Sequence, residues 1–291
     1  MTLLDILRKN EFTLSVELAP PNGGFDICKL KETVAAFNQL GVDFYSMTMG
    51  AAGNRLKKGT ISLAHKVQDW TGKNCIVHLT CLGYDKERIE EEVVNMHHLE
   101  LENILALRGD LSMEKKKEGA VVEDYLIDYR YATDLIAHLT KLNNFCIGGA
   151  AYPEGYGVDK NISTAVLRLK QKQDAGAKFA ITQMLFDAEI YFIFVEKCRD
   201  AGISIPIIPG VWMIKSYDNC LTAEKEPFYV TVPDNLQNLF KSVTKEEGKQ
   251  IGLDHTFKLC HELKEKGAPG VQLYLLGADN YSLDLLRRLK R

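Results

Sequence analysis

The stretch Leu105-Ala106-Leu107-Arg108-Gly109-Asp110-Leu111 joins an apolar run directly to an Arg-Gly-Asp tripeptide. The run 104–107 predicts a buried strand, and the tripeptide would place a guanidinium, a flexible backbone position and a carboxylate at its end. Arg-Gly-Asp alone is common in turns. It indicates a functional site only if other strands end at the same place with polar side chains of their own.

Seven further apolar runs share this character, and each is followed by a segment with helical periodicity. The eight expected strands are residues 14–18, 43–48, 75–79, 104–107, 145–151, 178–183, 204–209 and 270–276. Strands rich in Val, Ile and Ala without clean polar alternation fit a parallel sheet covered on both faces. Eight strand–helix units in 291 residues predict an α/β fold, a single (β/α)8 barrel of the TIM type, as one domain over 1–291.

The alternative is a doubly wound open sheet. Against it, no Gly-x-Gly-x-x-Gly follows the first strand, and no Walker-type phosphate loop occurs. One long helix is expected near 122–142. The seventh strand is expected to end at Gly210, and residues 211–247 are expected to be irregular, with short helical pieces.

Composition gives little support to several function classes. With 36 basic and 39 acidic residues, the net charge of −3 gives no support to nucleic-acid or membrane-surface binding. The run Lys115 to Lys117, flanked by Glu114 and Glu118, is expected to be a solvated loop. Seven scattered cysteines without a Cys-x-x-Cys pair predict reduced thiols. The N-terminus lacks a signal-peptide pattern and no segment has ~20 apolar residues, so a soluble cytoplasmic protein is expected.

Polar side chains stand at the expected ends of consecutive strands, which meet at one mouth in a barrel. They are Glu17, Thr48, His78, Thr80, Arg108, Asp110, Tyr152, Glu154 and Gln183. Small residues at 50–53, 109, 148 and 149 would let a flat ligand approach the backbone closely. The mouth is therefore the predicted ligand site.

Glu17 lies between Val16 and Leu18, so its carboxyl is expected in an apolar setting. It is either a structural ion-pair partner or, with a pKa raised by burial, a general acid, and we favour the acid. His78 alone is more typical of a core histidine than of a catalyst, whereas Gln183 suits a heterocycle that bears an amide. No metal-ligand spacing and no activated nucleophile is found, so a cofactor is expected to supply the chemistry.

The order of several short motifs adds a second argument. They are Ser15-Val16-Glu17-Leu18-Ala19-Pro20-Pro21, Met47-Thr48-Met49-Gly50-Ala51, His78-Leu79-Thr80-Cys81, Leu105 to Asp110, Tyr131-Ala132-Thr133-Asp134-Leu135, Ala150-Ala151-Tyr152-Pro153-Glu154, Asp174-Ala175-Gly176-Ala177, Ile181-Thr182-Gln183 and Ile208-Pro209-Gly210. Through these motifs the sequence resembles the methylenetetrahydrofolate reductase family, of the bacterial type, over essentially its full length.

The resemblance implies a flavin, normally FAD, that takes hydride from NADH or NADPH and reduces 5,10-methylenetetrahydrofolate to 5-methyltetrahydrofolate. It makes Glu17 the general acid that assists opening of the methylene bridge to a 5-iminium cation. It places Asp110 near the flavin pyrimidine and the pterin, and Gln183 on the folate. The implied flavin contacts are Thr48, His78, Arg108, Gly109, Asp110, Tyr131, Ala132, Tyr152 and Lys172.

Some positions depart from the family pattern. Relatives carry Asp, Asn and Arg where this chain has Ala165, Arg168 and Gln171, and His where it has Tyr156. These positions hold the distal part of the cofactor, so FMN is the alternative to FAD. An Asn-Arg pair that grips folate is replaced by Gly277-Ala278. The chain ends after the barrel, so the C-terminal regulatory domain of animal forms is expected to be absent.

Two other functions stay open at this point. The chain fits the folate-reducing subunit of a larger electron-transfer complex, whose partner would supply electrons in place of a nicotinamide nucleotide. It also fits a related flavin barrel that oxidises an amino acid such as proline. A homo-oligomer is expected. The choice of NADH or NADPH and the physiological direction are not determined by the sequence.

Overall fold

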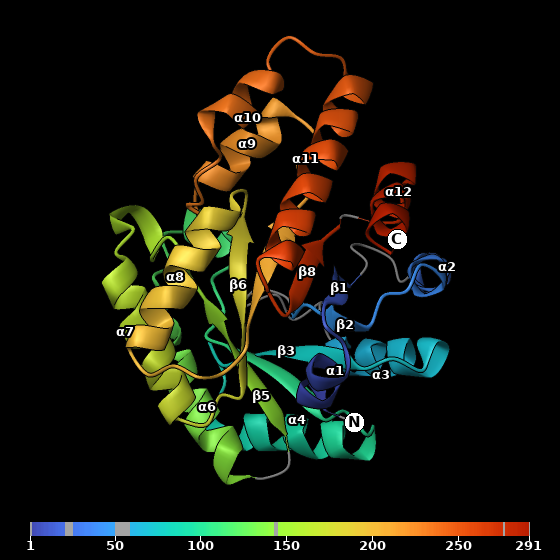
Figure 1. The fold of residues 1–291 in the computed structure, drawn as a ribbon. Coiled ribbons are helices and arrows are strands. Elements are labelled where there is room, and N and C mark those ends of the chain that lie inside the picture. The colour runs from blue at the N-terminus through green and yellow to red at the C-terminus, as the bar shows by residue number, and fades with distance from the viewer. Residues whose placement is uncertain (1, 21–25, 50–58, 143–144, 276, 291) are drawn as a thin grey trace.

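A computed structural model describes residues 2–20, 26–49, 59–142, 145–275 and 277–290. Eight parallel strands follow one another in chain order around a closed barrel, and β8 pairs with β1 (Figure 1). Helices surround the strands on the outside (Figure 1). The predicted (β/α)8 barrel is confirmed. No helix in the described ranges is both long enough and apolar enough to span a membrane.

The strands are β1 Thr13–Leu18, β2 Phe44–Met47, β3 Cys75–Thr80, β4 Asn103–Leu107, β5 Cys146–Ala151, β6 Phe179–Leu185, β7 Ile207–Trp212 and β8 Gly270–Tyr274. The helices are α1 Leu3–Lys9, α2 Ile27–Gln39, α3 Thr60–Thr71, α4 Lys86–His98, α5 Met113–Lys117, α6 Ala132–Lys141, α7 Ile162–Asp174, α8 Ala188–Asp200, α9 Tyr217–Glu224, α10 Asp234–Leu239, α11 Lys245–Glu265 and α12 Asn280–Leu289. Short 3-10 turns occupy Val122–Tyr125 and Gly157–Asp159. Residues 50–53, where the sequence predicts that a flat ligand can approach the backbone, lie outside the described residues. Residue 276 of the last expected strand also lies outside them.

The single helix expected near 122–142 is wrong. The segment holds a 3-10 turn and then α6, which begins only at Ala132. The carboxylate of Asp134 accepts hydrogen bonds from the backbone N–H groups of Arg130 and Tyr131, each at 2.8 Å. Because a carboxylate that binds N–H groups in this way starts a helix, α6 begins after Tyr131. The charged run before it is also not a loop, since it forms α5.

The seventh strand is displaced from the expected 204–209, and Gly210 lies inside it instead of ending it. Pro206 has no N–H to donate to a sheet and precedes the first strand residue. A Cβ on Gly210 would lie 2.5 Å from the carbonyl oxygen of Thr182 and 2.7 Å from the ring of Tyr274. The glycine is thus a point of close approach between neighbouring strands, and this permits the register shift of β6 against β7 near Ile181.

The N-terminal end of the barrel is closed by α1. Leu3 and Ile6 are buried and pack in one cluster with inward residues of the strands, among them Phe44 and Ile76. The backbone N–H of Leu3 donates a 2.7 Å hydrogen bond to the side chain of Asn103 at the start of β4. With this end sealed, a ligand can enter the barrel only from the carboxyl ends of the strands.

A polar layer lies inside the barrel between α1 and the mouth. The hydroxyl of Ser15 donates to the side-chain oxygen of Gln272 at 2.7 Å, and the Gln272 amide donates to the hydroxyl of Ser46 at 3.0 Å. All three side chains are buried, and their mutual bonds satisfy their polar groups. Because side chains alternate along a strand, the next inward residue of β1 after Ser15 is Glu17, at the mouth.

Candidate functional site

A cavity of about 400 Å³ opens at the carboxyl ends of the strands, within the usual size range of ligand pockets. Its lining is Glu17, Thr48, Met49, His78, Leu105, Leu107, Ala150, Tyr152, Ile181, Thr182, Gln183, Met184, Trp212, Phe228 and Tyr274. The structure therefore brings Glu17, Thr48, His78, Tyr152 and Gln183 together, as the sequence predicted for the mouth.

Burial raises the pKa of the Glu17 carboxyl to about 8. About a quarter of its side chain, 26%, still faces the cavity. The carboxyl is therefore largely protonated at neutral pH and remains accessible to a molecule that fills the cavity. A protonated, accessible carboxyl is what a general acid requires.

His78 is an ionisable neighbour of Glu17, with Nε2 3.8 Å from the carboxylate oxygen Oε2. Burial lowers the pKa of His78 to about 4, so the imidazole is neutral at pH 7. In the part of the chain that the structure describes, its Nε2 has no hydrogen-bond partner. The two groups are thus a neutral acid beside a neutral imidazole, and the structural ion pair considered for Glu17 does not form there.

The bulged region of β6 determines what Gln183 can offer a ligand. Its side-chain oxygen accepts a 2.9 Å hydrogen bond from the backbone N–H of Met184, and the amide NH2 group has no acceptor among the residues that the structure describes. The hydroxyl of Tyr274 donates to the carbonyl of Thr182 at 3.0 Å, and the N–H of Gly210 donates to the Thr182 hydroxyl at 2.8 Å. These bonds anchor the bulge and hence the position of Gln183.

The sequence missed Trp212, Phe228 and Tyr274. Trp212 lies beyond the strand expected at 204–209, and Phe228 lies in a segment after β7 that has no periodic pattern. Tyr274 had a usable signal, since it lies two residues after the inward-facing Gln272 on β8 and therefore on the same face. The aromatic wall of the cavity thus comes largely from the last third of the barrel.

Arg108, Gly109 and Asp110 lie at the same end of the barrel but outside the cavity lining. Gly109 has a φ of +88°, a left-handed conformation that favours glycine. Arg108 is exposed. The carboxylate of Asp110 accepts hydrogen bonds from the Lys116 ammonium at 2.9 Å and from the N–H of Leu111 at 2.8 Å. In this conformation the tripeptide and Glu17 do not share one cavity.

A buried cation lies next to the cavity. Lys172 on α7 is only 7% exposed, and its ammonium donates to the carbonyl of Ala150 at 2.6 Å. Burial lowers the pKa of Lys172 to about 8. Among the described residues no carboxylate lies within ion-pair distance of it. The rings of Tyr152 and Tyr156 stand beside it with centroids 4.2 Å apart. A buried cation without a counter-ion suits an anionic group such as a phosphate.

The remaining predicted contacts lie farther out along α6 and α7. Tyr131 is 39% exposed, and the guanidinium of Arg168 lies 4.8 Å from its ring centroid. Arg168 also donates to the side chain of Gln171 at 3.3 Å. Ala132 is the buried first residue of α6, and Ala165 is buried on α7. The four positions that depart from the family pattern thus offer one guanidinium from Arg168, one phenol ring from Tyr156 and two uncharged side chains, of which Ala165 is buried.

After β8, Gly277 has a φ of +126°, and Ala278 is partly buried against the barrel core. Neither residue offers a charged side chain to a ligand. Elsewhere, in the described segments, no group of three or more His, Cys, Asp or Glu residues is arranged to hold a metal ion.

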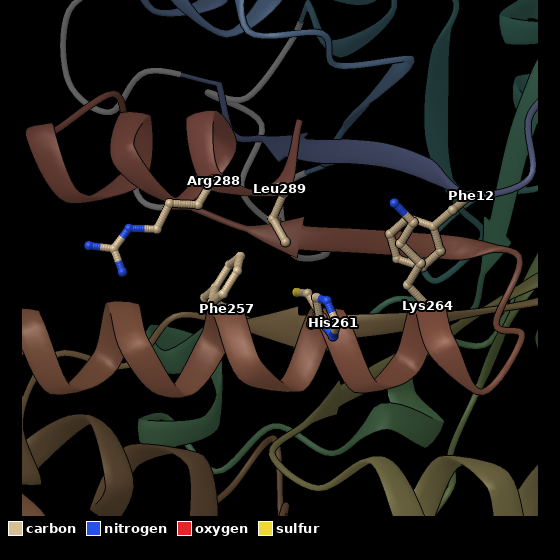
Figure 2. A pocket seen from close by; sticks show the side chains of 7 residues that line it. Phe12, Phe257, His261, Lys264, Arg288 and Leu289 are labelled. Carbon is tan, nitrogen blue, oxygen red and sulfur yellow. The ribbon is translucent and has the colours of Figure 1, made fainter. Parts of the chain in front are cut away.

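A second hollow of about 320 Å³ lies outside the barrel, between α11 and α12 and against Phe12 (Figure 2). Its walls are mostly apolar, with Lys264 5.9 Å from the ring centroid of Phe12. Arg288 at its edge is already paired with Asp254 at 2.8 Å. No strand-end residue reaches this groove, so it is separate from the chemistry of the mouth.

A closed parallel barrel with the carboxyl of Glu17 and the imidazole of His78 in a cavity at its mouth defines the class: a (β/α)8 barrel with a candidate ligand site at the carboxyl ends of its strands. The methylenetetrahydrofolate reductase family matches residues 2–290, and the chain belongs to this family.

Two relatives illustrate the range of the match. Methylenetetrahydrofolate reductase 1 of Schizosaccharomyces pombe is 31% identical over 288 residues, covering 97% of this chain but 46% of that protein. The chain therefore spans about half the length of this relative. The 5,10-methylenetetrahydrofolate reductase of Buchnera aphidicola subsp. Acyrthosiphon pisum is 30% identical over 282 residues, covering 95% of this chain and 91% of that protein.

A solved structure is similar in fold. It is described as an uncharacterized protein from Clostridium thermocellum that binds two copies of 5-methyl-5,6,7,8-tetrahydrofolic acid. The TM-score is 0.67, and the match covers 100% of this chain and 99% of that chain. At 15% sequence identity the likeness supports the barrel fold alone.

Proposed function

We propose that this chain reduces 5,10-methylenetetrahydrofolate to 5-methyltetrahydrofolate with a flavin bound at the barrel mouth and Glu17 as general acid. The observation that carries the proposal is the raised pKa of Glu17, about 8, in the mouth cavity of a chain that belongs to the methylenetetrahydrofolate reductase family. A carboxyl in this state can donate a proton near neutral pH, which an ordinary glutamic acid cannot.

Glu17 would act on the amine nitrogen that leaves when the methylene bridge of the folate opens. Its proton neutralises the charge that develops on this nitrogen, and the other nitrogen is left as the 5-iminium cation. Neutral His78 supports this role, because a charged imidazole 3.8 Å away would stabilise the carboxylate and lower the pKa of Glu17. A folate that fills the cavity would also displace water from the exposed part of the carboxyl.

Gln183 is proposed to bind the pterin. The bond from Met184 fixes the orientation of the amide, so its NH2 group would donate to a carbonyl or ring nitrogen of the substrate. Trp212 and Phe228, whose ring centroids are 6.4 Å apart, supply apolar surface beside it. A flat heterocycle is the ligand shape that such walls accommodate.

The residues present fit a flavin nucleotide. The ammonium of Lys172 has no counter-ion among the described residues and suits the phosphate, while Leu105, Leu107 and Ala150 form an apolar wall for the ring system. When bound, the flavin supplies hydride transfer from NADH or NADPH to the folate. FAD is the expected form. FMN stays the alternative, since Ala165 and Gln171 carry no charge toward a second phosphate.

The further proposed flavin contacts are Thr48, His78, Arg108, Gly109, Asp110, Tyr131, Ala132 and Tyr152. Thr48, His78 and Tyr152 line the cavity directly. Asp110 lies outside the cavity lining and contacts Lys116 in this conformation.

The test is an anaerobic titration of the purified protein. We expect a yellow protein whose flavin is bleached by NADH or NADPH and recoloured by methylenetetrahydrofolate, and extraction of the flavin distinguishes FAD from FMN. A reduced flavin that methylenetetrahydrofolate cannot reoxidise would contradict the proposal. Reoxidation by folate without reduction by either nucleotide would favour the subunit of an electron-transfer complex.

A further inference from the structure

The segment 225–231, between α9 and α10, lies over part of the mouth. Phe228 at its centre lines the cavity. The segment is folded locally, because the N–H groups of Phe228 and Tyr229 both bind the carbonyl of Lys225, at 2.9 and 3.1 Å. We call residues 225–231 the strap. Its position over the mouth must come from contacts with other parts of the barrel.

The end of the strap near Thr231 is held by several contacts. The backbone N–H of Thr231 donates to the carboxylate of Glu154, after β5, at 3.0 Å. Lys160 forms an ion pair with Glu154 at 3.0 Å and also binds the Thr231 hydroxyl. Val230 is buried among apolar side chains of α9 and α10. This end is therefore anchored by packing as well as by charge.

At the other end, among the described residues, one ion pair joins the strap to the far side of the mouth, and Phe228 packs against the apolar cluster of Trp212. The Glu226 carboxylate, 58% exposed, receives the ammonium of Lys116 at 2.7 Å. Lys116 belongs to α5, after β4, so the contact joins two different βα segments across the mouth. The same ammonium binds Asp110 at 2.9 Å, and its side chain is only 22% exposed. One lysine thus connects the strap to the Arg-Gly-Asp segment.

We propose that Lys116 and Glu226 are positioning residues, a clasp that holds the strap over the mouth so that Phe228 forms a wall of the folate site. Neither residue lines the cavity, so each acts through Phe228. A clasp between partly exposed charges is weak and sensitive to salt. It therefore suits a segment that must open for each substrate and close again. The identity of the ligand rests on the proposed function, whereas the closure of the strap does not.

The first measurement needs no ligand. Hydrogen exchange at the amides of Phe228 and Tyr229 should be about two- to fivefold faster in Glu226→Gln, the range expected for one partly exposed ion pair. Glu118→Gln is the matched control, since Glu118 caps the same short helix and pairs with its Lys115 at 3.5 Å, and it makes no hydrogen bond or ion pair with the strap in the described structure. An unchanged exchange rate in Glu226→Gln would contradict the proposal that Lys116 and Glu226 hold the strap.

The second measurement uses 5-methyltetrahydrofolate as the binding probe and methylenetetrahydrofolate as the substrate. In Glu226→Gln, Kd and KM should rise by about the same two- to fivefold factor, while kcat and flavin reduction by the nucleotide stay unchanged. Lys116→Met combined with Glu226→Gln should weaken binding less than the sum of the two single effects. Faster exchange with unaltered Kd and KM would contradict the proposal that Phe228 forms a wall of the folate site. Absence of folate turnover in the unmodified protein would contradict the proposed function and leave the exchange result standing.

Discussion

Glu17 differs from an ordinary surface glutamic acid only in its surroundings. Alternation along β1 turns it inward, above the polar layer of Ser15 and Gln272, and burial raises its pKa to about 8. The imidazole of His78, 3.8 Å away, is neutral for the same physical reason. Burial therefore shifts both groups toward their uncharged forms, and the pair holds a transferable proton without an ion pair.

Glu17→Gln should remove the acidic proton and keep the size and shape of the side chain. We expect the rate of folate reduction to fall by about 10²-fold or more, the usual contribution of a general acid, while flavin reduction by the nicotinamide nucleotide is unaffected. The two half-reactions are measured separately by anaerobic stopped flow. Equal losses in both would contradict the acid role.

The pH dependence provides the check on the same residue. Since the acid form of Glu17 is the active one, the rate of folate reduction should be constant well below pH 8 and fall as the pH rises through about 8. This decline should disappear in Glu17→Gln. A rate that rises across that range would mean that Glu17 acts as a base.

Lys172→Met removes the buried cation proposed to bind the flavin phosphate. A hydrogen bond to a charged group contributes ~1.5–3 kcal/mol, so the flavin Kd should rise by about 10- to 100-fold. Equilibrium dialysis of the flavin measures the change without any activity assay. Lys170→Met is the matched control, because Lys170 pairs with Asp174 on the same helix. Equal flavin affinity in the two variants would contradict the assignment of Lys172.

At the scale of elements, α1 has a structural task that determines where the site lies. It seals the N-terminal end of the barrel with Leu3 and Ile6 and binds Asn103 of β4 through the backbone. Nothing in the local sequence of residues 3–9 indicates that this helix packs across the barrel end. That packing involves strands far away in the chain.

Leu3→Ala should leave a cavity in this cluster. Leu3 is fully buried, and such truncations cost about 2–5 kcal/mol of the free energy of unfolding. Urea denaturation followed by circular dichroism gives the value. Arg8→Ala on the same helix, with its side chain 76% exposed, should change stability by less than about 0.5 kcal/mol. If Leu3→Ala lowered the free energy of unfolding by as little as Arg8→Ala, α1 would not be sealing the barrel.

The errors in predicting elements have a common origin in long-range contacts. Apolar periodicity located most strands and helices to within a residue or two, because burial imposes it locally. It failed at 122–142, where the Asp134 carboxylate starts a new helix. It also failed at β7, where glycine at 210 predicts the end of a strand but instead allows the backbone to lie close to Tyr274. In both places a side-chain contact decided the boundary.

At the scale of the molecule, every proposed residue depends on the closure of one barrel, because the mouth collects residues from strands β1 to β8. The match to 91% of the bacterial relative supports the proposal that residues 1–291 form a single flavin-binding catalytic domain. Such a domain should gain and lose its flavin site and its helices together.

We therefore expect one unfolding transition, with flavin release and loss of helical circular dichroism at the same temperature. Added flavin at about 100 times its Kd should increase the free energy of unfolding by ~2.7 kcal/mol, since it binds only the folded state. Differential scanning calorimetry with and without flavin measures both. Two separated transitions, only one of them shifted by flavin, would contradict the single domain.

The sequence by itself determined the barrel class, the family and the set of polar residues at the strand ends, because alternation, periodicity and motif order are local properties of the chain. Only the tertiary structure decided which of them share a cavity. It placed Glu17 beside a neutral His78, turned Asp110 toward Lys116, and brought Phe228 and Tyr274 to the mouth. Burial, and the pKa shifts that follow from it, depend on segments that meet only when the barrel closes, and these contacts are not encoded in any local pattern.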